Sequence, residues 1–295
     1  MKPRTVLMTG CTSGIGRATA LHLAAQGHRV FATGRNLKAL EELAREAKGT
    51  LHPIELDVTS SASVETARAM VEQRTQGAGI DVLINNAGFS LVCPVELLED
   101  AALQRVFDTN VFGLVRVTRA FVPAMRARRS GLIINMSCIT GRITYPFEGA
   151  YTASKHAVES ISDALRLELA PFGIGVTIME PGAVSTSFEA NSSRTSGFSE
   201  QQQRDYASMV EAAWQSRSEA FGMVPGPAFV AAAIGRVVAA RRPPIRVVTP
   251  VSTSLLLRFL LSLPTRWRDA VVARIFGGLK APPAASSPST GRALP

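Results

Sequence analysis

Short apolar runs rich in β-branched residues alternate along the chain with longer stretches in which apolar residues recur every three or four positions. The short runs predict strands near residues 4–9, 29–33, 50–56, 80–85, 131–137, 174–180 and 245–248. The longer stretches predict helices near residues 14–26, 37–47, 61–76, 100–129, 151–171 and 228–240. Strands that are apolar at nearly every position are typical of a parallel sheet buried on both faces. The alternation therefore predicts an α/β fold with a doubly wound parallel sheet of about seven strands and helices on both faces.

The composition indicates a folded chain, since 46% of its 295 residues are hydrophobic and only 19% are charged. Three cysteines, Cys11, Cys93 and Cys138, are scattered without a C-x-x-C pair, so we expect neither a disulfide framework nor a metal site. The apolar stretch that follows the first basic residues is too short for the core of a signal peptide. These features predict a cytoplasmic protein.

The positive charge of the chain is concentrated in one segment. The formal net charge is +9, but residues 241–295 hold nine basic residues and one acidic residue, whereas residues 1–240 are almost balanced. Nucleic-acid binding needs a basic surface on the folded domain, so this distribution argues against a nucleic-acid partner.

The C-terminal segment divides into two parts. Residues 251–280 combine a leucine-rich run with arginines and Trp267. The run is too short to cross a bilayer. As a helical segment it would cap a pocket, form a contact between subunits, or lie peripherally on an anionic membrane. Residues 281–295 are rich in proline, alanine and serine and predict a disordered tail, which leaves residues 1–250 as the main domain.

A glycine-rich loop joins the first predicted strand to the first predicted helix. Glycine lets the backbone approach phosphates closely, and the free N–H groups of a helix start stabilise an anion. The candidate pyrophosphate contacts are Gly10, Thr12, Ser13, Gly14, Ile15 and Gly16. Taken alone, such glycines could instead serve tight packing.

Gly34 and Arg35 follow the second predicted strand, where a dinucleotide-binding protein contacts the adenosine ribose. A carboxylate at this place would bind the ribose 2′-hydroxyl, but none is present. The Arg35 guanidinium is suited to pair with a 2′-phosphate, which predicts NADP(H) rather than NAD(H) as cofactor. The alternative is a solvated Arg35 that only stacks on the adenine.

Tyr151 and Lys155 lie four residues apart at the start of a predicted amphipathic helix, and therefore share one face. An ammonium close to a phenol stabilises the phenolate. This makes Tyr151 a candidate general acid and base, although the pair alone is a common pattern on helix surfaces.

These features belong to a series of motifs: Thr9-Gly10-x-x-x-Gly14-x-Gly16, Asp57-Val58, Asn85-Asn86-Ala87-Gly88, Asn110, Tyr151-x-x-x-Lys155 and Pro181-Gly182-x-x-x-Thr186. In this order and at this spacing they resemble the short-chain dehydrogenase/reductase family over about residues 4–250. The local sequence is most similar to the branch of 17β-hydroxysteroid and retinol dehydrogenases. The resemblance implies a Rossmann fold and an NADP(H)-dependent enzyme that interconverts a carbonyl and an alcohol on a bulky apolar substrate that is steroid-, retinoid- or lipid-like. It also implies a homodimer or homotetramer.

Carried over residue by residue, the resemblance assigns further roles. It implies that Lys155 holds the nicotinamide ribose and that Asn110 anchors a water that relays protons. The cofactor contacts it implies beyond the glycine loop, Arg35, Tyr151 and Lys155 are Asp57, Val58, Asn86, Ala87, Gly88, Pro181, Gly182, Val184 and Thr186. Apolar substrate walls are expected from Phe89, Leu91, Val92, Tyr145, Phe147 and Phe188.

One position departs from the family pattern. The substrate-orienting serine of the family usually lies thirteen residues before the tyrosine, which is where this chain has Cys138, with Ser137 just before it. A thiol is a weaker hydrogen-bond donor than a hydroxyl. Three interpretations stay open: Cys138 orients the substrate less well, Cys138 only packs and Ser137 or another group acts, or the protein is an NADP-binding regulatory module with weakened catalysis.

Overall fold

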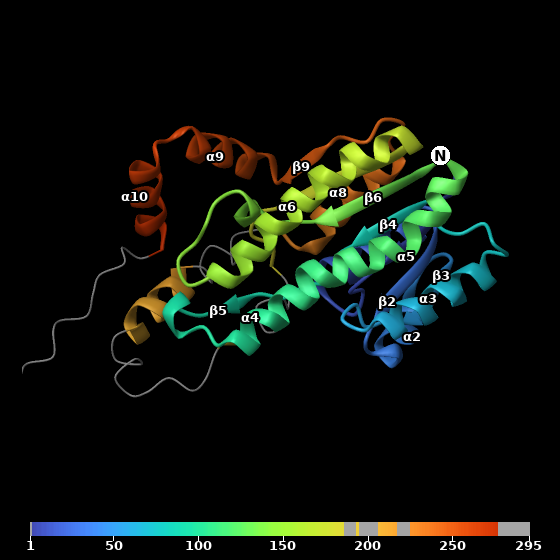
Figure 1. Ribbon diagram of the computed structural model, residues 1–295, viewed down its shortest axis with the longest axis horizontal. Coiled ribbons are helices and arrows are strands. Elements are labelled where there is room, and N and C mark those ends of the chain that lie inside the picture. The colour runs from blue at the N-terminus through green and yellow to red at the C-terminus, as the bar shows by residue number, and fades with distance from the viewer. Residues whose placement is uncertain (1, 186–192, 195–205, 217–224, 277–295) are drawn as a thin grey trace, which may run out of the picture.

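The computed structural model describes residues 2–185, 193–194, 206–216 and 225–276. Seven strands form one sheet in the order β3-β2-β1-β4-β6-β7-β9, with parallel pairing between all neighbours (Figure 1). The strands are β1 (Thr5–Met8), β2 (Arg29–Gly34), β3 (Leu51–Glu55), β4 (Val82–Asn85), β6 (Gly131–Met136), β7 (Ile174–Pro181) and β9 (Arg246–Thr249). The predicted doubly wound α/β fold and all seven predicted strands are confirmed.

Helices cover both faces of the sheet. Successive side chains of a strand point to opposite faces, and both faces are apolar, so each needs a covering layer. In β1, Val6 and Met8 face one apolar cluster and Leu7 faces the other. The first cluster contains residues of α1 (Gly14–Ala25), α2 (Leu37–Glu46) and α8 (Pro227–Ala239). The second contains residues of α3 (Ser61–Arg74), α5 (Gly113–Arg128) and α6 (Gly149–Leu169). The sheet is therefore buried on both sides.

The helix predicted at residues 100–129 is interrupted. It consists of α4 (Asp100–Phe107), a π-helical turn η2 (Asp108–Phe112) and α5. The π turn contains the buried Asn110, whose amide nitrogen donates to the Phe89 carbonyl and to Ser154 Oγ at 3.0 Å each. Such turns are frequent at functional sites. The apolar spacing on either side of the turn gave no sign of it.

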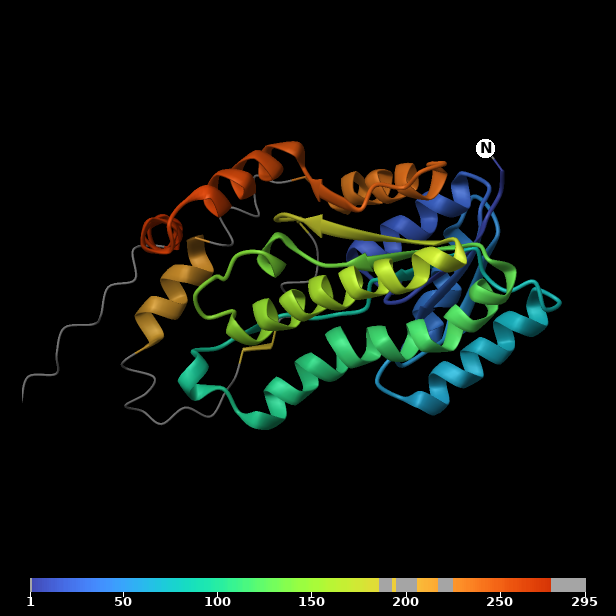
Figure 2. The same cartoon turned by 45° about the horizontal axis from the view of Figure 1, so that its top comes forward.

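Several short elements were not among the predicted strands and helices. They are the two-stranded sheet of β5 (Leu91–Val92) and β8 (Ser193–Arg194), the short helices η1 (Val95–Leu97), η3 (Ile139–Gly141) and η4 (Ala170–Phe172), and a helix over residues 206–216. The described part of the predicted helical segment 251–280 forms two helices, α9 (Val251–Ser262) and α10 (Thr265–Ile275). Both lie at the end of the molecule remote from the N-terminus (Figure 1 and Figure 2). The predicted tail 281–295 lies outside the described residues.

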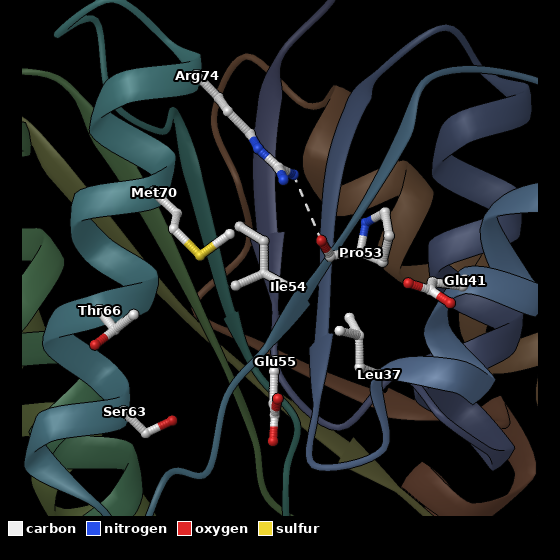
Figure 3. A pocket seen from close by; sticks show the side chains of 9 residues that line it. All are labelled: Leu37, Glu41, Pro53, Ile54, Glu55, Ser63, Thr66, Met70 and Arg74. Atoms are coloured by element: carbon white, nitrogen blue, oxygen red, sulfur yellow. Dashed lines mark hydrogen bonds between the residues drawn. The ribbon is translucent and has the colours of Figure 1, made fainter.

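The β3 edge of the sheet carries a surface hollow of about 440 Å³ between α2 and α3 (Figure 3). Pro53 lies in β3, where an edge strand tolerates a residue without an N–H donor. Arg74 Nη1 donates to the Pro53 carbonyl across the hollow, with an N–O distance of 3.4 Å. None of the predicted site residues lines this hollow.

Candidate functional site

A second cavity, of about 860 Å³, lies at the carboxyl ends of the strands, where doubly wound folds bind their ligands. The predicted site residues that line it are Gly10, Thr12, Ser13, Gly14, Ile15, Gly16, Arg35, Asp57, Val58, Asn86, Ala87, Gly88, Ser137, Cys138, Tyr151, Lys155, Pro181, Gly182 and Val184. Asn110 does not line the cavity, and Thr186 lies outside the described residues.

The glycine loop fits a pyrophosphate. Gly10 and Gly14 have φ angles of 71° and 55°, in the left-handed region that favours glycine. A Cβ at Gly16 would lie 2.0 Å from the Gly10 carbonyl oxygen, so no other residue fits there without moving the loop. The side chain of Ser13, the N-cap of α1, makes no capping hydrogen bond, and the first turn holds no acidic residue. The N–H groups at this helix start therefore remain available to an anion.

Asn86 fastens the loop after β4 to the glycine loop. Its amide nitrogen donates to the carbonyls of Thr9 and Gly10 at 2.9 and 3.1 Å. Thr9 Oγ1 in turn accepts hydrogen bonds from the backbone N–H groups of Asn86 and Ala87. Asn86, which was predicted to contact the ribose, therefore also has a structural role: it holds two walls of the cavity at a fixed spacing.

Arg35 follows β2, at the position where the sequence predicts a contact with the adenosine ribose. Arg35 is exposed, lines the cavity and makes no hydrogen bond or ion pair with the part of the chain that the structure describes. By contrast, Asp57 Oδ1 accepts from the backbone N–H and the hydroxyl of Thr59, at 2.9 and 2.8 Å. The Asp57 carboxylate is therefore held by its own loop, while the Arg35 guanidinium is free to meet a ligand.

Tyr151 and Lys155 are both buried on α6, in the wall of the cavity. Lys155 Nζ lies 5.6 Å from the centre of the Tyr151 ring and donates to the Met136 carbonyl at 2.8 Å. Burial lowers the pKa of Lys155 to about 8, although the nearby Cys138 and Glu159 act in the opposite direction. The ammonium is therefore still mostly charged at neutral pH, beside the phenol ring.

Asn110 is connected to the Tyr151–Lys155 pair by hydrogen bonds within the protein and does not line the cavity. Its Oδ1 accepts from the Phe89 N–H, and its amide nitrogen donates to Ser154 Oγ, which donates to the Tyr151 carbonyl at 2.7 Å. Asn110 thus ties the loop after β4 to the first turns of α6. The side chain that was predicted to anchor a relay water is already engaged by these bonds.

Ser137 and Cys138 both line the cavity, but their surroundings differ. The Ser137 side chain is buried beneath the η3 turn, since a Cβ at Gly141 would lie 2.6 Å from Ser137 Oγ. Cys138 is half-buried and packs against the cluster formed by Ile139, Ile143 and residues of α9. Cys138 is also close enough to Lys155 to interact with its charge.

A cluster of charged side chains lies behind the pair. Arg246 of β9 contacts Glu159 at 3.2 Å, Asp163 at 2.6 Å and Glu180 at 3.2 Å, and Arg142 lies 3.7 Å from Glu180. Glu180 is fully buried, which together with the charge of Glu159 raises the pKa of Glu180 to about 7. Arg246 therefore contacts three carboxylates, two of them on the helix that carries Tyr151.

Several residues that line the cavity were not predicted individually from the sequence. Glu148 is buried at the start of α6, and Ser216, Ile275 and Phe276 come from segments far along the chain. The rings of Phe276 and Tyr145 are 4.6 Å apart, which brings the end of α10 to the cavity wall. Ile275 and Phe276 belong to the segment 251–280, for which capping of a pocket was one of the predicted roles, but their individual contacts with the cavity depend on long-range packing.

Only some of the expected substrate walls are observed. Phe89 and Tyr145 line the cavity, whereas Leu91, Val92 and Phe147 do not. Leu91 and Val92 are buried in β5, whose short pairing with β8 was not predicted. Phe188 lies outside the described residues.

The described residues also bear on metal binding and on membrane insertion. No three histidine, cysteine, aspartate or glutamate side chains gather as metal ligands would in the described ranges. Within those same ranges, no helix has the length and hydropathy needed to cross a membrane.

Residues 4–197 match the family described as short chain dehydrogenase. The chain is 45% identical to retinol dehydrogenase 8 of Bos taurus over 63% of this chain, and it spans only 61% of that relative. It is 39% identical to 3-ketodihydrosphingosine reductase of Bacteroides thetaiotaomicron, over 83% of this chain and 87% of the relative. Among solved structures, a short-chain dehydrogenase from Streptomyces avermitilis superposes with a TM-score of 0.75 at 32% identity, covering 93% of this chain and 96% of that one.

Proposed function

This chain belongs to the short-chain dehydrogenase family, and from that premise we propose that it is an NADP(H)-dependent oxidoreductase that interconverts a carbonyl and an alcohol on a bulky apolar substrate. The observation that carries the proposal is the buried pair of Tyr151 and Lys155 in the wall of a cavity that also contains the glycine loop. One cavity thus combines a proton donor with a cradle for a dinucleotide.

The nicotinamide ring, when bound, supplies or accepts the hydride. Tyr151 donates its phenol proton to the substrate oxygen during reduction and takes a proton from the alcohol during oxidation. The Lys155 ammonium, 5.6 Å from the ring centre, stabilises the phenolate that is left. Burial of both side chains excludes bulk water from the proton transfer.

Cys138 is assigned to orienting the substrate oxygen. Two observations support this: Cys138 faces the cavity near Lys155, and the Ser137 hydroxyl is directed beneath the Gly141 turn. Because a thiol donates a weaker hydrogen bond than a hydroxyl, the expected turnover is lower than a serine at this position would give. Asn110 is assigned a positioning role, through its bonds to Ser154 and Phe89.

NADP(H) is proposed over NAD(H) because of the charge at the adenosine end. Arg35 follows Gly34 without a carboxylate beside it and has no partner among the described residues. A guanidinium in this position forms a charge-assisted pair with a 2′-phosphate. Thr186 is kept as a proposed contact of the carboxamide, although it lies outside the described residues.

The bulky apolar substrate is proposed from the cavity wall and from the relatives. Phe89, Ile139, Tyr145, Ile275 and Phe276 line the cavity. The relatives named above act on retinol and on 3-ketodihydrosphingosine, both of which carry long apolar chains. We therefore propose that this chain acts on a substrate of that kind, a steroid-like one included.

Three further assignments accompany this function. We propose a homodimer or homotetramer, residues 1–250 as the catalytic domain, and a cytoplasmic location. Cys11 is buried and forms no disulfide, which supports a reducing compartment.

The decisive experiment measures NADPH oxidation with a panel of retinoid, steroid and long-chain ketones and aldehydes. Tyr151→Phe should lower turnover by about 10²- to 10⁴-fold, the usual contribution of a general acid, while NADPH affinity stays near that of the wild type. Tyr206→Phe is the matched control: it also removes a phenol hydroxyl, but from a residue that does not line the cavity, and it should leave turnover unchanged. A wild-type protein that binds NADPH but reduces no carbonyl would instead support the regulatory module.

A further inference from the structure

The two helices that close the substrate end of the molecule have apolar side chains on both sides. On α9, Leu257 and Leu260 are buried against Ile139 and Ile143 of the η3 region. Val272 of α10 and Phe276, which directly follows this helix, are also buried. A surface helix normally has one apolar face and one polar face, so the opposite face of α9 is expected to be polar.

It is not polar. Val251, Leu255 and Phe259 recur every four residues along α9 and are 73%, 64% and 55% exposed. Trp267 on α10 is 69% exposed. We call these four residues the outer apolar face. Helices that are apolar all round are buried in a core or a membrane, and contiguous exposed apolar surface marks an interaction site.

The charges beside this face are almost all positive. Arg258 lies on α9, and Arg266, Arg268 and Arg274 lie on α10, while Asp269 is the single acidic residue of the two helices. Arg258, Arg266 and Arg274 are exposed. Lysine or arginine at an anionic membrane surface contributes about 1 kcal/mol each, and tryptophan is enriched at the boundary between headgroups and acyl chains.

A second copy of the chain fits this face poorly. A two-fold contact through the outer apolar face would bring the same arginines of both subunits together, and like charges across an interface are unfavourable by several kcal/mol. Asp269 alone does not compensate four arginines. The headgroups of anionic lipids supply the missing negative charge along the whole rim of the face.

The length of the helices defines the mode of contact. The 12 residues of α9 extend about 18 Å, well below the roughly 30 Å of a bilayer core. The helices would therefore lie in the plane of the interface, with apolar side chains in the acyl region and arginines among the headgroups.

We propose that α9 and α10 form a docking surface for an anionic lipid bilayer. Because Ile275 and Phe276 at the end of α10 also line the cavity, docking places the substrate end of the molecule against the membrane. An apolar substrate then enters the cavity from the bilayer, and this last consequence rests on the proposed function.

The test is binding of the purified full-length protein to vesicles, which requires no turnover. Phosphatidylcholine vesicles that contain phosphatidylserine should bind the protein, and about 1 M salt, where the Debye length is about 3 Å, should weaken the binding. Phe259→Glu should lower the partition coefficient at least about tenfold, since it places a charge where an aromatic ring enters the bilayer. Circular dichroism and NADPH affinity should stay unchanged.

Leu167→Glu is the matched control. Leu167 is 66% exposed on α6, and the substitution makes the same change of charge away from the outer apolar face. If Phe259→Glu loses no more binding than Leu167→Glu, the attraction is only that of a basic protein and the proposal is overturned. It is equally overturned if the wild type does not bind the phosphatidylserine-containing vesicles, whether or not sedimentation shows a dimer that Phe259→Glu dissociates. Vesicle binding without turnover on any carbonyl would contradict the proposed function and leave the docking surface intact.

Discussion

The two ends of the cavity are built in different ways. At the cofactor end, contacts come from loops that directly follow strands, and backbone groups of Gly10, Gly14 and Gly16 form the wall. At the substrate end, side chains converge from η3, from the start of α6, from residue 216 and from the end of α10. Backbone geometry thus shapes one end, and long-range packing of side chains shapes the other.

This difference teaches where each end tolerates change. A backbone cradle has no side chains to exchange, so a single added methyl group disturbs it. A wall of side chains that come from several separate elements can be altered one contact at a time. Substitutions at the two ends should therefore differ in size and in the ligand they affect.

The largest effect is expected at the cofactor end. Gly16→Ala places a Cβ at 2.0 Å from the Gly10 oxygen, so the loop must open and its hydrogen bonds to the phosphates are lost. Two charge-assisted bonds of about 1.5 to 3 kcal/mol each correspond to at least about a hundredfold weaker NADPH binding, measured by fluorescence titration. Gly226→Ala is the control, because a Cβ there meets nothing within 4 Å. An unchanged affinity of Gly16→Ala would contradict a rigid backbone cradle.

Arg35→Ala should have a smaller and more selective effect. Loss of one guanidinium fork to a 2′-phosphate is expected to weaken NADPH binding about tenfold to a hundredfold and to leave NADH binding unchanged. Arg45→Ala, which removes an exposed guanidinium from the far end of α2, should change neither affinity. If NADPH and NADH bind the wild type equally well in the same titration, the cofactor assignment is wrong.

Cys138→Ser should have the smallest effect, and it should be a gain. A donor to developing negative charge contributes up to about 3 kcal/mol, and a hydroxyl in place of the thiol recovers part of it, so kcat/KM should rise several-fold to about tenfold. Ser137→Ala should stay near the wild type, since Ser137 Oγ is directed beneath the η3 turn. The opposite pattern, with Ser137→Ala inactive and Cys138→Ser unchanged, would show that Ser137 is the working residue.

The same contrast explains how much could be predicted from the sequence. The strands and the glycine loop follow from local patterns, because apolar runs and a strand-to-helix turn need no distant partner. Asn110 was found by its place in a motif, but the π turn that holds it depends on bonds to Phe89 and Ser154. Ile275 and Phe276 lie in the segment 251–280, for which capping of a pocket was one of three predicted roles, but no local pattern singled them out, since Phe276 packs against the distant Tyr145.

Arg246 shows where this chain can be cut and rejoined. It ties β9 to Glu159 and Asp163 of α6, so a chain that ended before β9 would lose this cation beneath the helix of Tyr151 and leave Asp163 with Arg166 alone. The carbonyl of Thr249, the last residue of β9, accepts a hydrogen bond from the Gly182 N–H, and α9 begins only two residues later. A junction directly after Thr249 therefore keeps the ion pairs of Arg246 with α6, while α9, α10 and the rest of the C-terminal segment are exchanged. Chimeras that graft C-terminal segments of other family members at this junction would transfer the part of the cavity wall formed by Ile275 and Phe276 together with the outer apolar face.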